Sequence, residues 1–253
     1  MSYSIFLLSL AAFASAASMR VTDALLPRLA SDFHVGIGHA SAVVTGFAVA
    51  YGLMQVLFGP LGDRFGKLRV ISYSTAAAAL ASAACLLAPG FEGLLTARIF
   101  AGAFCGSIIP LSMAWIGDVV PYEGRQPILA RFLLGQILGL ASGTAIGGFA
   151  AEHVQWRWPF GLLAAWLAVC ALLIGLASRT DPVPRLEKAS HFARDAVGIL
   201  AHPWARIVVA TVFVEGMLVF GALAFIPTHL HFNRGLDLST AGLALVPYAL
   251  GGT

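Results

Sequence analysis

The sequence has little charge. Asp, Glu, Lys and Arg together make up 11% of its 253 residues, whereas a soluble domain carries about 25%. Hydrophobic residues make up 59%, and the mean hydropathy is +0.86. This balance excludes an ordinary soluble domain and predicts an integral membrane protein. The formal net charge is +3, but the basic residues are scattered through short segments, so we expect no nucleic-acid partner.

Cysteine is scarce as well. The three cysteines, Cys85, Cys105 and Cys170, each lie inside an apolar run. Their spacing suits neither a disulfide framework nor a metal site, so we expect them to act as small hydrophobic residues. No other cluster of metal-ligating residues is visible in the sequence, and we expect no cofactor.

A cleaved signal peptide is one interpretation of the N-terminus. Residues 14–16, Ala-Ser-Ala, resemble a signal-peptidase site. No Lys or Arg precedes them, however, and the apolar character resumes at Ala24. These features favour one long first membrane span.

Seven apolar runs are long enough to cross a bilayer, which takes about 20 helical residues. They cover residues 4–27, 40–61, 70–89, 94–117, 128–150, 159–178 and 207–229. We expect residues 1–178 to form a six-helix bundle, residues 179–206 a polar linker with a short surface helix over 190–200, and residues 207–253 the first helices of a second bundle. The eighth apolar segment, 239–253, would give only about 22 Å of helix, short of a hydrocarbon core about 30 Å thick.

A glycine-rich charged segment, residues 59–70, separates the second and third runs and predicts a tight turn. Its spacing resembles the loop between the second and third spans of major facilitator superfamily transporters, G-x-L-x-D-R-x-G-R-R/K. The matching residues are Gly59, Leu61, Asp63, Arg64, Gly66 and Lys67. Leu68 departs from the pattern, and Arg69 restores the charge one position later. An ordinary basic loop is the alternative.

The resemblance implies an all-α major facilitator fold, built from two six-helix bundles of inverted repeats. It implies a secondary transporter that works by alternating access, with protons and a small molecule as its partners and a lipid bilayer around it. Asp63 and Arg64, together with Asp118 at the end of the fourth span, would serve conformational switching. The chain would supply the first bundle and the start of the second, so it looks truncated in the eighth span and would need the missing C-terminal half.

The fifth span has a glycine at every fourth residue: Gly135, Gly139, Gly143 and Gly147. This stripe predicts close packing against another helix. Residues 139–148 also resemble the antiporter motif of the same superfamily, G-x-x-x-G-P-x-x-G-G, with Thr144 in place of the proline. Proton-coupled efflux of a small organic solute or drug is therefore our predicted function, and a plain packing groove is the alternative for these glycines.

Charged residues inside spans cost at least about 2.5–3.5 kcal/mol each, so they indicate functional sites. Asp23, four residues before Pro27, resembles the first-span acid of drug:proton antiporters, and Arg98 resembles the fourth-span arginine of the family. We expect Asp23 and Arg98 to lie at similar depth and to form an ion pair. Glu215 in the seventh span is a second candidate for proton coupling. Neutral polar residues that could line a substrate path are Gln136, Tyr51 and Gln55.

The alternatives for these residues are structural. Asp23 could meet water at the interface, Arg98 could extend to the interface, and Glu215 could pair with other helices. Gln136, Tyr51 and Gln55 could bond to neighbouring helices.

The basic residues also predict the orientation. Most lie after the second, fourth and sixth spans or in the linker: Arg64, Lys67, Arg69, Arg125, Arg179, Arg185, Lys188, Arg194 and Arg206. Arg131 lies on the same side, and only Arg28, Arg157 and Arg234 lie in the opposite turns. The first group and the N-terminus are therefore expected in the cytoplasm, with the protein in a plasma membrane such as a bacterial inner membrane.

Two other function classes remain open from the sequence alone. An intramembrane serine protease is disfavoured, because the nearest match to G-x-S-G, residues 140–143, begins with Leu140, and no H-E-x-x-H motif occurs. We therefore expect no enzymatic activity. A non-transporting membrane remnant is the second alternative.

Overall fold

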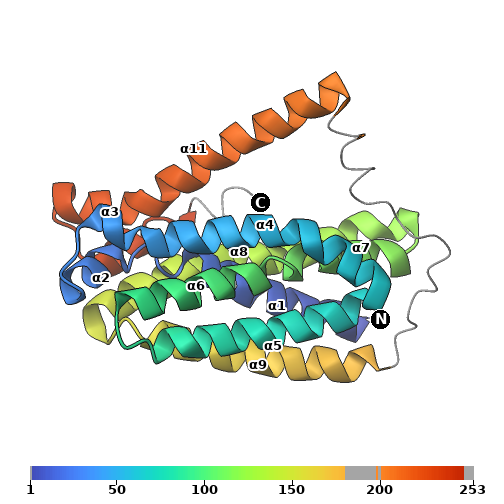
Figure 1. Ribbon diagram of the computed structural model, residues 1–253, viewed down its shortest axis with the longest axis horizontal. Helices are drawn as coiled ribbons and strands as arrows, with labels where there is room; N and C mark the ends of the chain where they lie inside the picture. The colour runs from blue at the N-terminus through green and yellow to red at the C-terminus, as the bar shows by residue number, and fades with distance from the viewer. Residues whose placement is uncertain (1, 180–197, 199–200, 248–253) are drawn as a thin grey trace.

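The computed structural model describes residues 2–179, 198 and 201–247, and the described chain forms helices and no strands (Figure 1). The helices are α1 (Ser2–Arg20), α2 (Leu26–Asp32), α3 (Ile37–Ala40), α4 (Ala42–Phe65), α5 (Lys67–Leu86), α6 (Phe91–Cys105), α7 (Ile108–Val119), α8 (Tyr122–His153), α9 (Trp158–Ser178), α11 (Pro203–Arg234) and α12 (Leu238–Leu243). Seven helical segments among the described residues are long and apolar enough to cross a membrane. The predicted all-α membrane fold is confirmed.

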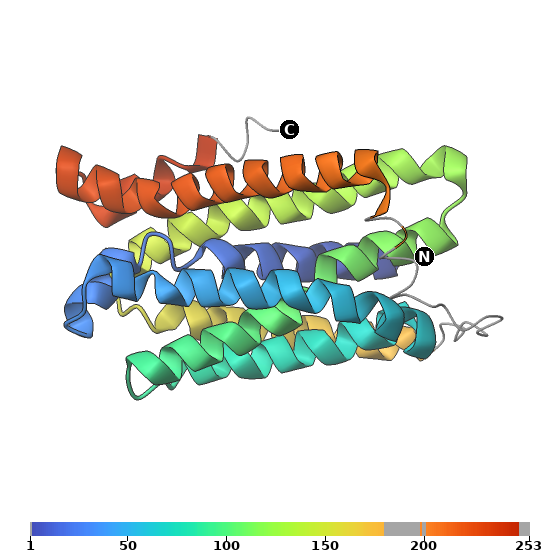
Figure 2. The same ribbon diagram turned by 45° about the horizontal axis from the view of Figure 1, so that its top comes forward.

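The bundle is built from three pairs of extensively packed helices: α1 with α8, α4 with α6, and α5 with α9. α7 continues the path of α6 after a break at Gly106 and Ser107 (Figure 2). The core between the helices consists mainly of alanine, leucine, isoleucine and phenylalanine side chains. Small residues are common in it, which allows the backbones to approach closely, as membrane helices require.

α11 lies apart from this bundle. Its described buried residues, Leu223, Ala224, Pro227 and Thr228, all belong to its C-terminal part. Its N-terminal part diverges from the other helices (Figure 1). α12 returns the chain to the bundle and packs against α8.

The first span is shorter than predicted. α1 ends at Arg20, and residues 21–25 form a turn before α2 begins at Leu26, so the expected continuous helix to Pro27 is wrong. The turn is held by short-range backbone hydrogen bonds, from Asp23 N to Arg20 O at 3.1 Å and from Leu25 N to Thr22 O at 3.1 Å. The change of chain direction allows the side chain of Asp23 to reach back to the end of α1.

The turn between the second and third spans is much tighter than predicted. α4 runs through Gly59 and Pro60 as far as Phe65, and α5 begins at Lys67. Gly66 alone separates the two helices, and its φ of 92° and ψ of 125° lie where residues other than glycine are strained. Asp63 and Arg64 are therefore helical residues and not loop residues.

Other boundaries also differ from the prediction. α8 begins at Tyr122, after its N-cap Pro121, and includes Pro127, so it starts six residues before the predicted fifth span at 128–150. α11 begins at Pro203, inside the predicted linker. Apart from residue 198, the predicted surface helix over 190–200 lies outside the described residues, as does the end of the eighth segment. The described part of that segment contains the six-residue α12, a turn over 244–245 and two helical residues, 246–247.

Candidate functional site

Asp23 forms a buried ion pair with Arg20. Asp23 Oδ2 lies 3.0 Å from Arg20 Nη1, and the two side chains are 0% and 7% exposed. Neither carboxylate oxygen has a hydrogen-bond partner among the described residues. A buried carboxylate normally receives several hydrogen bonds. Asp23 therefore has one ion-pair partner, Arg20, and the charge of the nearby Arg98 adds to its stabilisation.

Arg98 lies close by but is bound to other groups. Its Nη1 donates to Ser18 O at 2.9 Å and to Ser18 Oγ at 3.4 Å, and its Nη2 donates to Thr22 Oγ1 at 3.3 Å. The guanidinium lies 4.1 Å from the ring centroid of Phe47 and 5.8 Å from that of Phe160. Arg98 thus ties α6 to the end of α1 and is fully buried.

The expected ion pair between Asp23 and Arg98 is absent. The two groups do lie near one another, because Thr22 binds Arg98 and is the neighbour of Asp23. Asp23 instead pairs with Arg20, three residues earlier, because α1 ends at Arg20. The three-residue spacing of Arg20 and Asp23 is the feature of the sequence that indicates this ion pair. Ser18 and Thr22, which lie one helical turn apart, are contacts of Arg98 that were not predicted from the sequence.

A second charged cluster joins α4, α5 and α7. Lys67 Nζ lies 2.6 Å from Asp118 Oδ2 and 3.1 Å from Asp63 Oδ1. The two carboxylates are about half exposed, whereas Lys67 is 14% exposed. One lysine thus bridges two acids, Asp63 four residues before it and Asp118 51 residues after it. Arg64 is not part of this cluster, and its guanidinium lies 5.1 Å from the ring centroid of Phe65.

The glycine stripe of α8 faces the backbone of α1. A β-carbon at these positions would lie 2.7 Å from Ser9 O for Gly135, 2.9 Å from Ala16 Cβ for Gly139, 2.8 Å from Ala17 Cα for Gly143 and 3.1 Å from the carbonyl carbon of Val21 for Gly147. Such distances are too short for ordinary packing, so only glycine fits the present spacing of the two helices. Thr144, in the place of the motif proline, leaves α8 helical and donates to Leu140 O at 3.3 Å.

A similar contact, which the sequence analysis missed, joins α6 to α4. β-carbons on Gly102 and Gly106 would lie 2.8 Å from Phe47 Cα and 3.3 Å from the carbonyl carbon of Tyr51. Gly102 and Gly106 follow Arg98 at intervals of four residues, so Arg98 and Gly102 share one face of α6, and Gly106 lies at its C-cap. This spacing of small residues is the sequence signal for the contact.

α12 is fastened to α8 at the end of the bundle away from Gly66. Ser239 N donates to Glu152 Oε2 at 3.0 Å, and a β-carbon on Gly242 would lie 2.7 Å from Thr144 O. Asp237 caps α12 by accepting from Thr240 N at 3.1 Å. The hydrogen bonds from Thr240 lower the pKa of Asp237.

The other candidate residues make no described contact with Asp23. Glu215 is exposed on α11 and has no hydrogen bond or ion pair with a described residue. Gln136 is half-buried on α8, and Gln55 is exposed on α4. Tyr51 is half-buried and stacks on Phe47, with ring centroids 6.0 Å apart.

The amino-acid sequence matches the pattern of one known protein family. The Major Facilitator Superfamily matches residues 8–253, nearly the entire chain. The chain belongs to this superfamily. As a major facilitator superfamily protein, it has the fold of a membrane transporter.

Several curated relatives of this superfamily chain are named for export or resistance. The chain is 28% identical over 192 residues to the multidrug export protein EmrB of Escherichia coli K12, an alignment that covers 76% of this chain and 37% of EmrB. It is 26% identical over 166 residues to the fatty acid resistance protein FarB of Neisseria gonorrhoeae, covering 63% and 33%. The match therefore spans about a third of the length of these relatives.

Solved transporters show the same fold. A bacterial homologue of the human lysosomal transporter Spinster, in an inward-facing and occupied conformation, superposes with a TM-score of 0.78 at 20% identity, covering 98% of this chain and 58% of that one. A D-xylose-proton symporter superposes with a TM-score of 0.60 at 18% identity, covering 98% and 66%. At these identities the likeness concerns the fold alone.

Proposed function

We propose that this protein exports small organic solutes in exchange for protons, by alternating access. The observation that carries the proposal is the buried Asp23, whose carboxylate has one ion-pair partner and no hydrogen bond among the described residues. The names of EmrB and FarB, a multidrug export protein and a fatty acid resistance protein, support an amphipathic substrate. Residues 1–178 are then the first six-helix half, 179–202 the linker and 203–253 part of the second half, which begins with α11.

Protonation of Asp23 is the proposed coupling step. A proton on the carboxylate removes its charge and leaves Arg20 buried without a partner, which costs several kcal/mol. This free-energy cost favours any conformation in which Arg20 is hydrated or pairs with another anion. Arg98, which holds Ser18 and Thr22 on either side of Arg20, transmits the change to α6. Gln136, Tyr51 and Glu215 are proposed to line the substrate path, Glu215 from the second half.

The conformation of the structure fits an inward-facing state. α12 is fastened to α8 at one end of the bundle, while α11 diverges towards the end that carries Arg64, Lys67 and Arg125 (Figure 1). We propose that this basic end is cytoplasmic, together with the N-terminus, in a bacterial inner membrane. The cluster of Lys67, Asp63 and Asp118 is at this end, where it can respond to closure of the second half.

Transport in proteoliposomes tests the function. Full-length protein is reconstituted with a fluorescent amphipathic cation or a fatty acid inside, and a pH gradient is imposed across the membrane. We expect solute movement against its own gradient only while the proton gradient persists, and loss of movement with a protonophore. Solute movement that is independent of the proton gradient would exclude proton coupling. No solute movement under any condition would favour a non-transporting protein.

The orientation can be tested with two cysteine substitutions at opposite ends of α8. Glu123 and Gln155 are both exposed, while the native cysteines are buried. In intact cells, a membrane-impermeant maleimide is expected to label the Gln155→Cys protein and to reach the Glu123→Cys protein only after lysis. The reverse labelling pattern would invert the proposed topology.

The charged cluster gives a kinetic prediction. Asp63→Asn weakens the ion pair with Lys67 at 3.1 Å, and an exposed pair of this kind contributes about 0.2–1 kcal/mol. We expect a lower maximal transport rate with little change in substrate affinity, because the cluster would bias conformational switching and not binding. Glu123→Gln, an exposed acid at the same end, is the control. An unchanged rate in Asp63→Asn would remove the cluster from the transport cycle.

A further inference from the structure

Arg69 does not join the charged cluster beside it. The sequence suggested that Arg69 replaces the family charge missing at Leu68, but Lys67 alone bridges Asp63 and Asp118. The side chain of Arg69 is exposed, and it has no ion pair or hydrogen bond with any residue that the structure describes. Arg179, the residue after α9, is also exposed, and its side chain likewise has no such partner in the described chain.

These two arginines line the same groove between α5 and α9. The groove has a volume of about 710 Å³, and apart from its arginines it is lined mainly by alanine, leucine and glycine. The hollow exists because small residues face each other across the two helices. Ser72, on its floor, donates to Ala171 O at 2.9 Å and so exposes no unsatisfied hydroxyl to it. The groove is therefore apolar, with positive charge at one end.

The length of the groove matches one leaflet of a bilayer. Its lining residues run from Arg69 to Leu80 on α5 and from Ala168 to Arg179 on α9. Each stretch covers about 16 Å of helix at 1.5 Å per residue, and half of a hydrocarbon core about 30 Å thick is about 15 Å. The two arginines therefore lie at the level of the headgroups when the apolar part of the groove lies in the acyl region.

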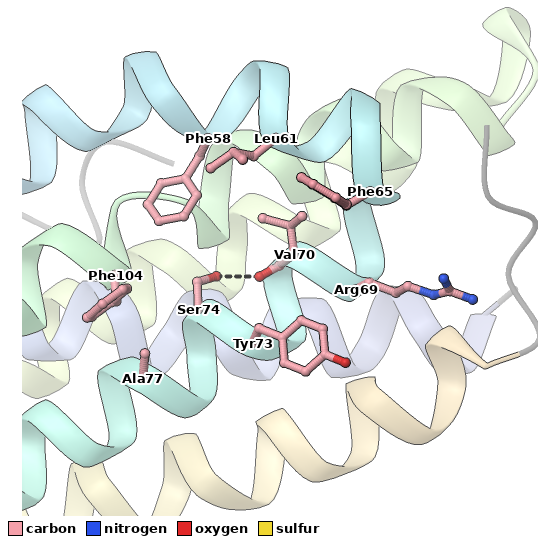
Figure 3. Close-up of a pocket in the computed structure, with 9 residues that line it drawn as sticks. All are labelled: Phe58, Leu61, Phe65, Arg69, Val70, Tyr73, Ser74, Ala77 and Phe104. Atoms are coloured by element: carbon pink, nitrogen blue, oxygen red, sulfur yellow. Dashed lines mark hydrogen bonds between the residues drawn. The ribbon is translucent and has the colours of Figure 1, made fainter. Parts of the chain in front are cut away.

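A second groove lies next to the first, and the side chain of Tyr73 separates the two. It has a volume of about 570 Å³, lies between α4, α5 and α6, and shares Arg69 and Tyr73 with the first groove. Figure 3 shows its apolar wall, with Phe58 and Phe104 at one end and the Arg69 guanidinium and Tyr73 hydroxyl extending towards the opposite end. Tyr73 is 76% exposed, so it stands between the two grooves.

The surface that carries the α5–α9 groove faces away from the second half. α5 and α9 lie on the side of the bundle opposite α11 (Figure 1), and α12 packs on α8. Large apolar side chains beside the groove are strongly exposed, with Leu80 at 74% and Leu172 at 65%. In a membrane-spanning bundle, such a surface meets lipid.

We propose that these grooves bind one anionic glycerophospholipid from the leaflet at the basic end. The phosphate binds between Arg69 and Arg179, whose guanidinium groups suit bidentate contacts to phosphate oxygens. One acyl chain lies in the α5–α9 groove and the other in the neighbouring groove, with Tyr73 between them. An anionic headgroup is favoured because two cations without an ion-pair partner among the described residues face it, and each contributes attraction near the membrane surface.

The test measures lipid preference in the purified chain by native mass spectrometry, with equal amounts of phosphatidylglycerol and phosphatidylcholine in the detergent micelle. We expect the Arg69→Gln/Arg179→Gln double variant to lose about 30-fold in preference for phosphatidylglycerol, which corresponds to about 1 kcal/mol for each arginine. Arg131→Gln, an exposed arginine on α8 outside both grooves, should keep the preference. An equal loss in Arg131→Gln would mean attraction by net charge and would overturn the site.

A second variant separates the groove from the charges. Ala76→Phe fills the α5–α9 groove with an aromatic ring and leaves both arginines in place. We expect it to reduce phosphatidylglycerol retention, and millimolar inorganic phosphate should not compete. Retention unaffected by Ala76→Phe, or displaced by inorganic phosphate, would show that the acyl chains do not occupy the groove. Since this readout is binding, it is independent of whether the protein exports solutes against protons.

Discussion

In the Asp23→Asn variant, transport driven by a pH gradient is expected to disappear while downhill substrate exchange continues. Asparagine keeps the shape of the side chain but cannot take up or release a proton. The variant also leaves Arg20 as a buried cation without its partner at 3.0 Å, which typically costs about 3–5 kcal/mol. The measurement is substrate movement in proteoliposomes with and without a pH gradient, using the full-length protein.

Two further variants separate coupling from folding. Arg20→Gln combined with Asp23→Asn removes both charges, so the double variant should regain stability and remain uncoupled. Asp32→Asn is a matched control, because Asp32 pairs with Arg28 four residues earlier but is partly exposed, and it should change neither property. Continued uphill transport in Asp23→Asn would exclude Asp23 as the coupling group and direct attention to Glu215.

Gly143→Ala is expected to destabilise the bundle by about 1–3 kcal/mol. The added methyl group would lie 2.8 Å from the Cα of Ala17, and a backbone atom cannot rotate away as a side chain does. α1 and α8 would have to separate, which would loosen the contacts along the whole glycine stripe. Thermal unfolding of the 253-residue chain in detergent measures the effect.

The control for this variant is Gly52→Ala on α4. A β-carbon on Gly52 meets no atom within 4 Å, so the substitution tests helix propensity alone. It is expected to raise stability by about 0.5–1 kcal/mol, because alanine favours a helix more than glycine does. Equal effects of the two substitutions would mean that the close approach of α8 to α1 contributes nothing to stability.

The membrane spans could be predicted from the sequence because they depend on local composition. A run of about 20 apolar residues meets the thickness of the bilayer whatever lies elsewhere in the chain, and all seven predicted runs overlap helices of sufficient length. The boundaries were less accurate, as the extension of α4 to Phe65 and of α8 back to Tyr122 show. Proline and glycine near the end of an apolar run suggested turns, whereas Gly59, Pro60 and Pro127 are all helical.

The sequence by itself determined that this protein is an α-helical membrane protein with the charged motif of a transporter superfamily, because hydropathy, charge placement and short motifs are properties of the chain alone. Only the tertiary structure decided which charges meet. Asp23 pairs with Arg20 and not Arg98 because a helix ends three residues earlier, and Lys67 reaches Asp118 because α5 and α7 pack together. Arg69 faces a groove with Arg179, more than a hundred residues away. Such contacts depend on how separate helices pack together. They also depend on the position of each helix end, to within one helical turn.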